Sequence, residues 1–254
     1  TNNNDSCVLI PTRFRTNHLV EPLAIPDAKP RFSYALKLLS GISPQTSKNH
    51  YQTAYRITCK NALTGELLWD TGKVFSRETL DIEYAGTPLT SLQRVQWKVQ
   101  IWDEQGRPCS STATSDDNDD LPWFETGLLD EVAWNDAEWI ARFGKLPGNV
   151  TLCSLMTETE ENKVPRFRSL INLSAKKQQE LVYIRAYIVG LGYYQLSING
   201  QRVGVSLLDP AWTTYSKRVL YAAHDVTDLI LGNPTENNSR QQVAVGVELG
   251  NGEW

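Results

Sequence analysis

Apolar and polar residues alternate along three stretches in the first half of the chain, RFSYALKLL, YRITCKN and RVQWKVQIW. A period of two residues is typical of antiparallel strands that bury one face, because successive side chains point to opposite sides of the sheet. Polar residues such as Arg56 and Lys98 occupy the solvent-facing positions. The residues that this pattern predicts to be buried are Phe32, Tyr34, Leu36, Leu38, Tyr55, Ile57, Cys59, Val95, Trp97, Val99 and Ile101.

Turn sequences separate these strands, at LTGE (63–66), AGTP (85–88) and EQGRP (104–108). Short strands with this spacing favour an all-β fold, and we predict a fibronectin-type-III-like sandwich over residues 21–115, after an N-terminal arm over 1–20. Cys59 lies late in one strand and Cys109 begins another, so we expect them near opposite ends of the sheet. They should not form a disulfide, and Cys59 is interpreted as a small buried apolar residue.

The acidic run SDDNDD (115–120), followed by LPW, predicts a domain boundary. We interpret residues 116–145 as a linker and connecting segment. The carboxylates of the run leave a calcium loop open as an alternative, although the spacing lacks the glycine and the terminal glutamate of an EF-hand.

The stretch LVYIRAYIVGLGYYQLSINGQRVG predicts two strands joined through a glycine break, and Asn199 and Gly200 suit a type I′ hairpin turn. We therefore predict a jelly-roll-like sandwich over residues 146–254. GLGYYQ lacks the third glycine and the following helix of a dinucleotide loop, so phosphate binding is not expected there. The predicted inward residues are Val182, Ile184, Ala186, Ile188, Tyr194, Leu196 and Ile198, and the outward ones are Tyr183, Arg185 and Tyr187.

The segment LLDPAWTTYSKRVLY (207–221) combines turn residues with aromatic rings. An aromatic face beside hydroxyl and carboxylate groups can bind a sugar, because the ring stacks on the apolar C–H face while the polar groups bond its hydroxyls. Trp212 and Tyr215 are the candidate stacking residues. A packing role for Trp212 and a purely structural turn role for Asn199 remain open as alternatives.

The sequence supports no assignment of a catalytic residue. The histidines His18, His50 and His224 lie near no nucleophile signature. Carboxylates are plentiful between Glu125 and Glu138, but the two carboxyl groups of a glycosidase must flank one bond at a defined separation. Loop sequences alone do not show such a separation.

Composition narrows the partners and the compartment. The 254 residues carry a net charge of −4 with scattered basic residues and contain no long apolar run, so neither nucleic acid nor a membrane is expected as a partner. The four cysteines show no metal-binding spacing. The opening TNNNDSCVLIPTRF does not resemble a signal peptide, although a mature secreted protein would look the same. Glycosylation sequons occur at Asn4, Asn149, Asn172 and Asn237.

Several blocks in order resemble the N-terminal region of the α-L-rhamnosidases of glycoside hydrolase family 78. They include EPLAIPDAKPRFSYAL, LLWDTGKVFS, YAGTPLTSLQRVQWKVQIWDEQGR, FETGLLDEVAWNDAEWI, GLGYYQLSINGQRVG, LLDPAWTTYSKRVLY and VGVELGNGEW. The resemblance implies a fibronectin-like domain, a jelly-roll domain, further β-structure and an (α/α)6 barrel that carries the catalytic acid and base. No residue of this chain matches those barrel positions.

Family membership would also imply ligands. Members of the family invert the anomeric configuration of a terminal α-L-rhamnosyl group. Some relatives have a jelly-roll module that binds rhamnose through calcium, and Asn199, Asp209 and Asn251 have suitable side chains and loop positions for that role. The expected partners are therefore a rhamnose-containing glycan or glycoside and the remainder of the same enzyme, with calcium as an optional cofactor.

The closing stretch VELGNGEW reads as a strand that enters a glycine turn, so we expect a jelly roll cut before its closing strands. The favoured hypothesis is an accessory N-terminal portion of a rhamnosidase. The alternatives are a free-standing, lectin-like carbohydrate-binding protein and a structural spacer. A secreted or periplasmic location is favoured over a cytoplasmic one.

Overall fold

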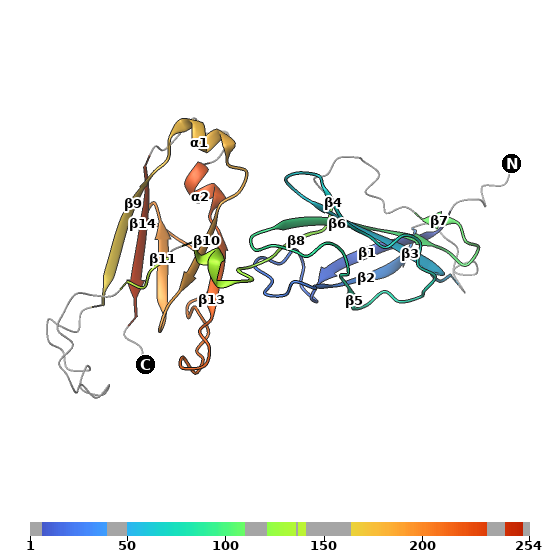
Figure 1. Ribbon diagram of the computed structural model, residues 1–254, viewed down its shortest axis with the longest axis horizontal. Helices are drawn as coiled ribbons and strands as arrows, with labels where there is room; N and C mark the ends of the chain where they lie inside the picture. The colour runs from blue at the N-terminus through green and yellow to red at the C-terminus, as the bar shows by residue number, and fades with distance from the viewer. Residues whose placement is uncertain are drawn as a thin grey trace. The chain divides into compact units, whose positions relative to one another are not determined.

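The computed structural model describes residues 7–39, 50–109, 121–135, 137–140, 164–232 and 242–250. The chain divides into two compact units, residues 1–137 and 138–254 (Figure 1). Both are built mainly of antiparallel strands, which confirms the all-β prediction. Among the described residues, no helix has the length and apolar character needed to cross a membrane.

The first unit contains two sheets, which follow the orders β1-β2-β5 and β4-β3-β6-β7, and β8 pairs with β6 on a separate branch of the second sheet. The 3-10 helix η2 (Glu131–Trp134) follows β8. The strand bounds are β1 (Leu9–Thr16), β2 (Arg31–Leu38), β3 (Ala54–Asn61), β4 (Leu67–Asp70), β5 (Ile82–Glu83), β6 (Arg94–Trp102), β7 (Pro108–Cys109) and β8 (Trp123–Glu125).

The core of the first unit lies between these sheets and confirms the predicted buried face. Strands β3 and β6 pair along their length, from Ala54 opposite Trp102 to Asn61 opposite Val95. Trp97 is 1% exposed, and its ring centroid lies 4.6 Å from that of Phe32. The other predicted inward residues are buried as well, except Leu36 and Leu38, which pack against the core while partly exposed.

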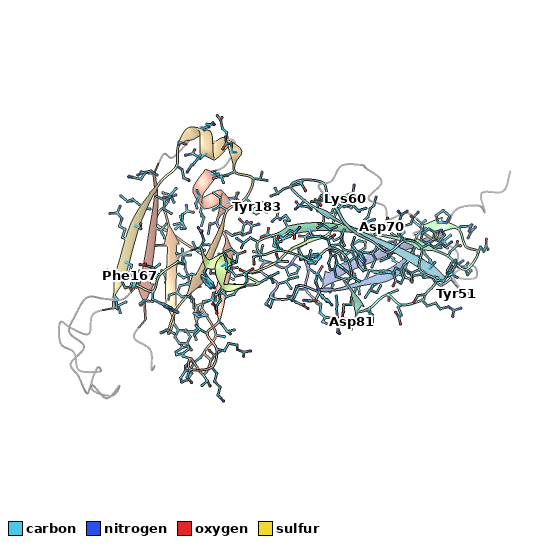
Figure 2. The ribbon with its side chains drawn as sticks, in the orientation of Figure 1. Tyr51, Lys60, Asp70, Asp81, Phe167 and Tyr183 are labelled. Carbon is cyan, nitrogen blue, oxygen red and sulfur yellow. A yellow bond between two sulfur atoms is a disulfide. The ribbon has the colours of Figure 1, made fainter. Side chains whose placement is uncertain are left out.

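The opposite face of the second sheet carries polar side chains. Lys60 on β3 and Asp70 on β4 are labelled in Figure 2. Arg56 donates to Asp70 from Nε at 2.8 Å. This hydrogen bond lowers the pKa of Asp70 to about 2, so the pair stays ionised at any ordinary pH.

The first unit extends beyond the predicted boundary at residue 115. Residues 116–120 lie outside the described part of the chain, but Trp123–Glu125 form β8 and pair with β6. Phe124 is fully buried, and Glu125 is 2% exposed with an ion pair to Arg94. A three-residue strand carries too little periodicity to be predicted next to an acidic run, so the sequence pattern indicates a linker there.

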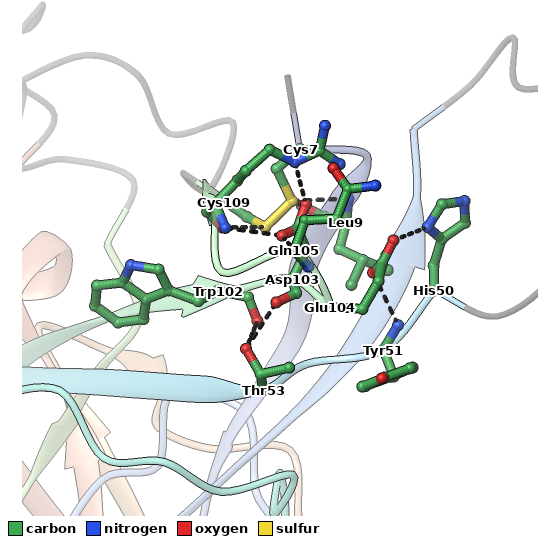
Figure 3. A network of polar contacts seen from close by, with 11 residues as sticks. Cys7, Leu9, His50, Tyr51, Thr53, Trp102, Asp103, Glu104, Gln105 and Cys109 are labelled. Carbon is green, nitrogen blue, oxygen red and sulfur yellow. Dashed lines mark hydrogen bonds and ion pairs between the residues drawn. A yellow bond between two sulfur atoms is a disulfide. The ribbon is translucent and has the colours of Figure 1, made fainter. Parts of the chain in front are cut away.

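The turn from β6 to β7 is held by the buried carboxylate of Asp103 (Figure 3). Its Oδ1 accepts from the backbone N–H groups of Gln105 at 3.0 Å and Arg107 at 2.8 Å, and Arg107 Nε donates to Oδ2 at 2.8 Å. Burial alone would raise the pKa of Asp103, but these hydrogen bonds outweigh burial and lower it. Gly106 completes the turn with a φ of 73°.

A disulfide joins Cys7 to Cys109 at the end of this turn, with the two Cα atoms 5.2 Å apart. Cys59 is buried and unbridged, as expected, but the sequence analysis did not anticipate the partner of Cys109. The two sulfurs and Asp103 lie close enough together to resemble a metal site. Because both sulfurs are bonded to each other, they are not available as thiolate ligands.

The second unit has a four-stranded sheet of order β12-β11-β14-β9 and a two-stranded sheet of β10 and β13. Tyr194, Leu196 and Ile198 face its core, which confirms the predicted alternation. The element bounds are β9 (Arg166–Asn172), α1 (Ala175–Glu180), β10 (Arg185–Val189), β11 (Tyr194–Ile198), β12 (Gln201–Arg202), β13 (Tyr221–Asp225), α2 (Thr227–Leu231) and β14 (Gln242–Leu249).

Two predictions for the first strand of this unit are wrong. Val182 was expected to face inward but is 70% exposed, because β10 begins only at Arg185, and Val182 lies in the connection after α1. Arg185 was expected to face solvent, but its side chain is 5% exposed and forms an ion pair with Asp225 at 2.8 Å. Ile184, Ala186 and Ile188 do pack against the core.

Replacing Asp103 with asparagine should destabilise the first unit in a pH-dependent way. We expect a loss of about 1–3 kcal/mol at pH 7, because the buried hydrogen bonds to Arg107 lose their ionised acceptor. The folded-state pKa is lowered, so this stabilisation is present above the unfolded value near 3.9 and is lost as the pH falls through the folded pKa. Urea unfolding at pH 7 and pH 3 measures the difference, with the exposed Glu66→Gln as control. An equal loss at both pH values would contradict the assignment.

Candidate functional site

The candidate site is a hollow of about 500 Å³ in the second unit, lined by four consecutive residues, Trp212, Thr213, Thr214 and Tyr215. They belong to the connection between β12 and β13. Trp212 is 62% exposed, so its ring is not a packing cap. The hollow therefore joins an accessible indole face to two hydroxyl groups and a phenol, a combination that suits a sugar ring.

Local hydrogen bonds fix the shape of this segment. Thr214 O accepts from the backbone N–H groups of Lys217 at 2.8 Å and Arg218 at 3.0 Å. Tyr215 Oη accepts from the backbone N–H of Gly192 at 2.9 Å, which ties the segment to the glycine break before β11. The phenolic O–H of Tyr215 can still donate to a ligand while accepting this bond.

Asp209 lies just before the hollow, and its side chain is half-buried. Its backbone O accepts from Tyr194 N at 3.1 Å, and its Oδ2 lies 3.9 Å from Nε2 of His224. Tyr194 Oη lies 3.3 Å from the same ring nitrogen, and burial raises the pKa of Tyr194. Gly204 packs directly against the His224 ring, because a Cβ at position 204 would lie only 2.9 Å from Cε1 of His224. Asp209 thus attaches the start of the 207–221 segment to β11 and β13.

The side-chain amide of Asn199 makes hydrogen bonds within the fold. Its Nδ2 donates to Leu229 O at 2.8 Å, and its Oδ1 accepts from Ala244 N at 2.9 Å. Its φ of 52° and the φ of 80° at Gly200 are those of the predicted type I′ turn. Both ends of the amide therefore join the hairpin to β14 and α2, which supports the structural reading of Asn199.

The candidate calcium ligands are not brought together. Asp209 bridges to Tyr194 at the start of β11, whereas Asn199 follows the end of that strand, about 16 Å further along at the usual rise per residue. Calcium ligands must converge to within about 2.6 Å of one ion. Asn199 and Asp209 therefore do not fit a shared calcium ion, and Asn251 lies outside the described residues.

Sequence reasoning identified Trp212 and Tyr215 but missed the two threonines between them. Thr213 Oγ1 donates to Arg218 O, and Thr214 is exposed beside the indole. The available signal was the hydroxyl pair itself, since Trp-Thr-Thr-Tyr places two hydroxyl groups between two aromatic rings. The structure groups Trp212 and Tyr215 and separates Asn199 from them.

Comparison with known proteins decides the family. Residues 11–130 match the model of the Rha78A-like N-terminal immunoglobulin domain, and residues 179–254 match the α-L-rhamnosidase N-terminal domain. The chain belongs to the α-L-rhamnosidase family. Within that family it corresponds to the accessory N-terminal portion, as the resemblance implied. The immunoglobulin and fibronectin type III folds share the two-sheet sandwich, so the first match agrees with the predicted architecture.

Individual relatives agree with this assignment. An α-L-rhamnosidase of Formosa agariphila is 30% identical over 91% of this chain and 23% of its own length. The solved α-L-rhamnosidase of Dictyoglumus thermophilum is 31% identical, with a TM-score of 0.73 over 100% of this chain and 26% of its own. The α-L-rhamnosidase of Aspergillus terreus, 24% identical with a TM-score of 0.65 over 96% of this chain and 24% of its own, shares the fold. The chain thus spans about a quarter of these relatives.

Replacing Asn199 with alanine should destabilise the second unit by about 2–3 kcal/mol, because Leu229 O and Ala244 N lose their partner. The loss should be the same in calcium and in EDTA. Thermal unfolding measures it, and Asn135→Ala is the matched control: Asn135 also has a positive φ, 48°, and makes no side-chain hydrogen bond among the described residues. A calcium-dependent stabilisation that disappears in Asn199→Ala would contradict the structural role.

Proposed function

We propose that the whole protein to which this chain contributes is an inverting α-L-rhamnosidase that removes terminal α-L-rhamnosyl groups from glycosides. The proposal is supported by the two family matches and by relatives named α-L-rhamnosidase that this chain matches over about 90% of its length. The catalytic acid and base would be supplied by the remainder of the same polypeptide, in a barrel domain. Inversion requires two carboxyl groups about 6.5–9.5 Å apart across the sugar.

Within that enzyme, the second unit would contact carbohydrate through the Trp212 hollow. L-Rhamnose is a 6-deoxy sugar, so its methyl group and C–H face offer an apolar surface for the exposed indole. The hydroxyl groups of Thr214 and Tyr215, which line the hollow, would bond the sugar hydroxyls. This contact needs no calcium ion, and neither Asn199 nor Asp209 takes part in it.

The disulfide supports a secreted or periplasmic location. Disulfides persist in oxidising compartments and are rare where thiols are kept reduced. The bond between Cys7 and Cys109 links positions 102 residues apart, and Cys109 is 2% exposed. A protein that depends on this link for attaching its first strand would fold best outside the cytosol.

Titrating the chain with L-rhamnose should quench tryptophan fluorescence with a dissociation constant of about a millimolar, as suits one small sugar with few contacts. Trp212→Ala should abolish the response. The matched control is Trp139→Ala, since Trp139 is 65% exposed in the same unit but lies outside the hollow. An unchanged response in Trp212→Ala would remove the hollow from the binding account.

Activity tests the assignment of the whole protein. The purified chain should release no nitrophenol from an aryl α-L-rhamnoside, because the proposed acid and base lie elsewhere in the enzyme. The intact gene product should release it with inversion, which NMR of the released sugar detects. Binding of rhamnose by the intact product without hydrolysis would instead support the lectin-like alternative.

A further inference from the structure

A second surface with features suited to carbohydrate lies in the first unit, along the extended segment that follows β4. Val74 of this segment bridges to Tyr55 on β3 and packs against the core. Exposed and partly buried side chains alternate along this segment, and Lys73, Phe75 and Arg77 are the exposed ones. Three side chains therefore share one side of a segment whose ends are about 13 Å apart.

Both cations of this segment lie over aromatic rings. Lys73 Nζ is 4.5 Å from the ring centroid of Trp102 and 5.2 Å from that of Phe75. The guanidinium carbon of Arg77 is 4.0 Å from the ring centroid of Tyr51. We call these five residues the aromatic-cation surface. Cation–π contacts orient the charges without neutralising them.

Two of the three rings of this surface are exposed, and the third, Trp102, is half-buried. Phe75 is 79% exposed and Tyr51 is 39% exposed. Trp102 ends β6, where it faces away from the sandwich core together with Lys98. Figure 3 shows Trp102 and Tyr51 on either side of Thr53. A contiguous exposed apolar patch marks an interaction surface, whereas single exposed apolar residues do not.

The two cations of the aromatic-cation surface have acidic neighbours, Glu78 next along the chain and Glu104 beside Tyr51, but neither carboxylate pairs with them. Neither Lys73 nor Arg77 forms an ion pair with any carboxylate among the described residues, whereas Arg56, Arg94 and Arg107 each do. Glu104, which accepts weakly from Tyr51 N, is held by Nδ1 of His50 at 2.8 Å. This positive surface lies on a chain whose net charge is −4. Lys73 and Arg77, which form no ion pair among the described residues, therefore favour a negatively charged ligand.

We propose that the aromatic-cation surface binds an acidic glycan, one whose sugar rings carry carboxylate or sulfate groups. Sugar rings would stack on Phe75 and Tyr51, while Lys73 and Arg77 bond the acidic substituents. Charge-assisted hydrogen bonds of this kind are about twice as strong as neutral ones. A simple polyanion would use the cations but leave the aromatic rings exposed, so the rings favour a glycan. This surface belongs to the first unit and the Trp212 hollow to the second, and its existence does not depend on rhamnosidase activity.

Calorimetric titration of the chain with oligogalacturonate and with a sulfated galactan oligosaccharide tests the proposal and distinguishes the two acidic groups. At least one should bind, and methyl-esterified oligogalacturonate, which is neutral, should bind at least about tenfold more weakly than the acid. Lys73→Ala with Arg77→Ala should weaken binding by about tenfold or more, and Phe75→Ala should also weaken it. The charge-preserving pair Lys73→Arg and Arg77→Lys should retain most of the affinity.

The matched control is Lys29→Ala with Lys37→Ala, which removes the same charge from exposed positions elsewhere in the unit and should leave binding unchanged. Failure of both acidic oligosaccharides to bind would overturn the proposal. So would a polyphosphate of equal charge that binds as tightly, an unaffected Phe75→Ala, or an equal loss in the control pair. Titration of the same variants with rhamnose tests binding at the Trp212 hollow independently of the aromatic-cation surface.

Discussion

The pleat of β6 is the constraint on which both faces of the first unit depend. Successive side chains of a strand point to opposite sides of the sheet. Because Trp97 points into the core between the sheets, Lys98 and Trp102 must point outward. A shift of one residue in the pairing with β3 would bury the lysine and expose the tryptophan at the centre of the core. The hydrophobic core therefore fixes the register, and the register places the outward surface at the same time.

The ends of β6 are held by buried polar groups and a disulfide in addition to apolar packing. Asp103 accepts hydrogen bonds from backbone N–H groups of the β6–β7 turn, and the disulfide joins Cys7 to Cys109 directly after that turn. At the opposite end of the same edge of β6, β8 adds the buried Phe124 and the ion pair between Glu125 and Arg94. A buried carboxylate requires such partners, since leaving either one unpaired costs several kcal/mol.

The second unit uses the same logic to hold an irregular segment. Its core strands β11 and β14 are regular, and the segment between β12 and β13 is attached to them by Tyr215 at Gly192 and by Asp209 at Tyr194. These anchors leave Trp212 exposed on a fixed backbone. Loops placed by a rigid scaffold are where binding residues gather, and an exposed tryptophan held in this way is suited to carbohydrate.

Much of this architecture could be predicted from local pattern. The alternating faces of β2, β3, β6 and β11 and the hairpin turn at Asn199 follow from period and turn chemistry, which operate over a few residues. The partner of Cys109 could not be predicted, because that pairing joins distant positions. The prediction that Val182 faces inward is wrong because α1 ends at Glu180 and β10 begins only at Arg185, so Val182 lies in the connection between them. The role of the Asn199 side chain depends on β14 and α2, which only the folded chain brings to it.

The central claim is that the second unit contacts rhamnosyl groups through Trp212 while Asn199 serves the fold. Residue-resolved NMR of the isotope-labelled chain, titrated with methyl α-L-rhamnoside in EDTA, tests it most directly. The account predicts saturable shifts of the Trp212 indole N–H and of the backbone amides from Thr213 to Tyr215, with Asn199 and its partner Ala244 unmoved. Shifts that appear only with calcium and centre on the Asn199 side-chain amide would contradict it.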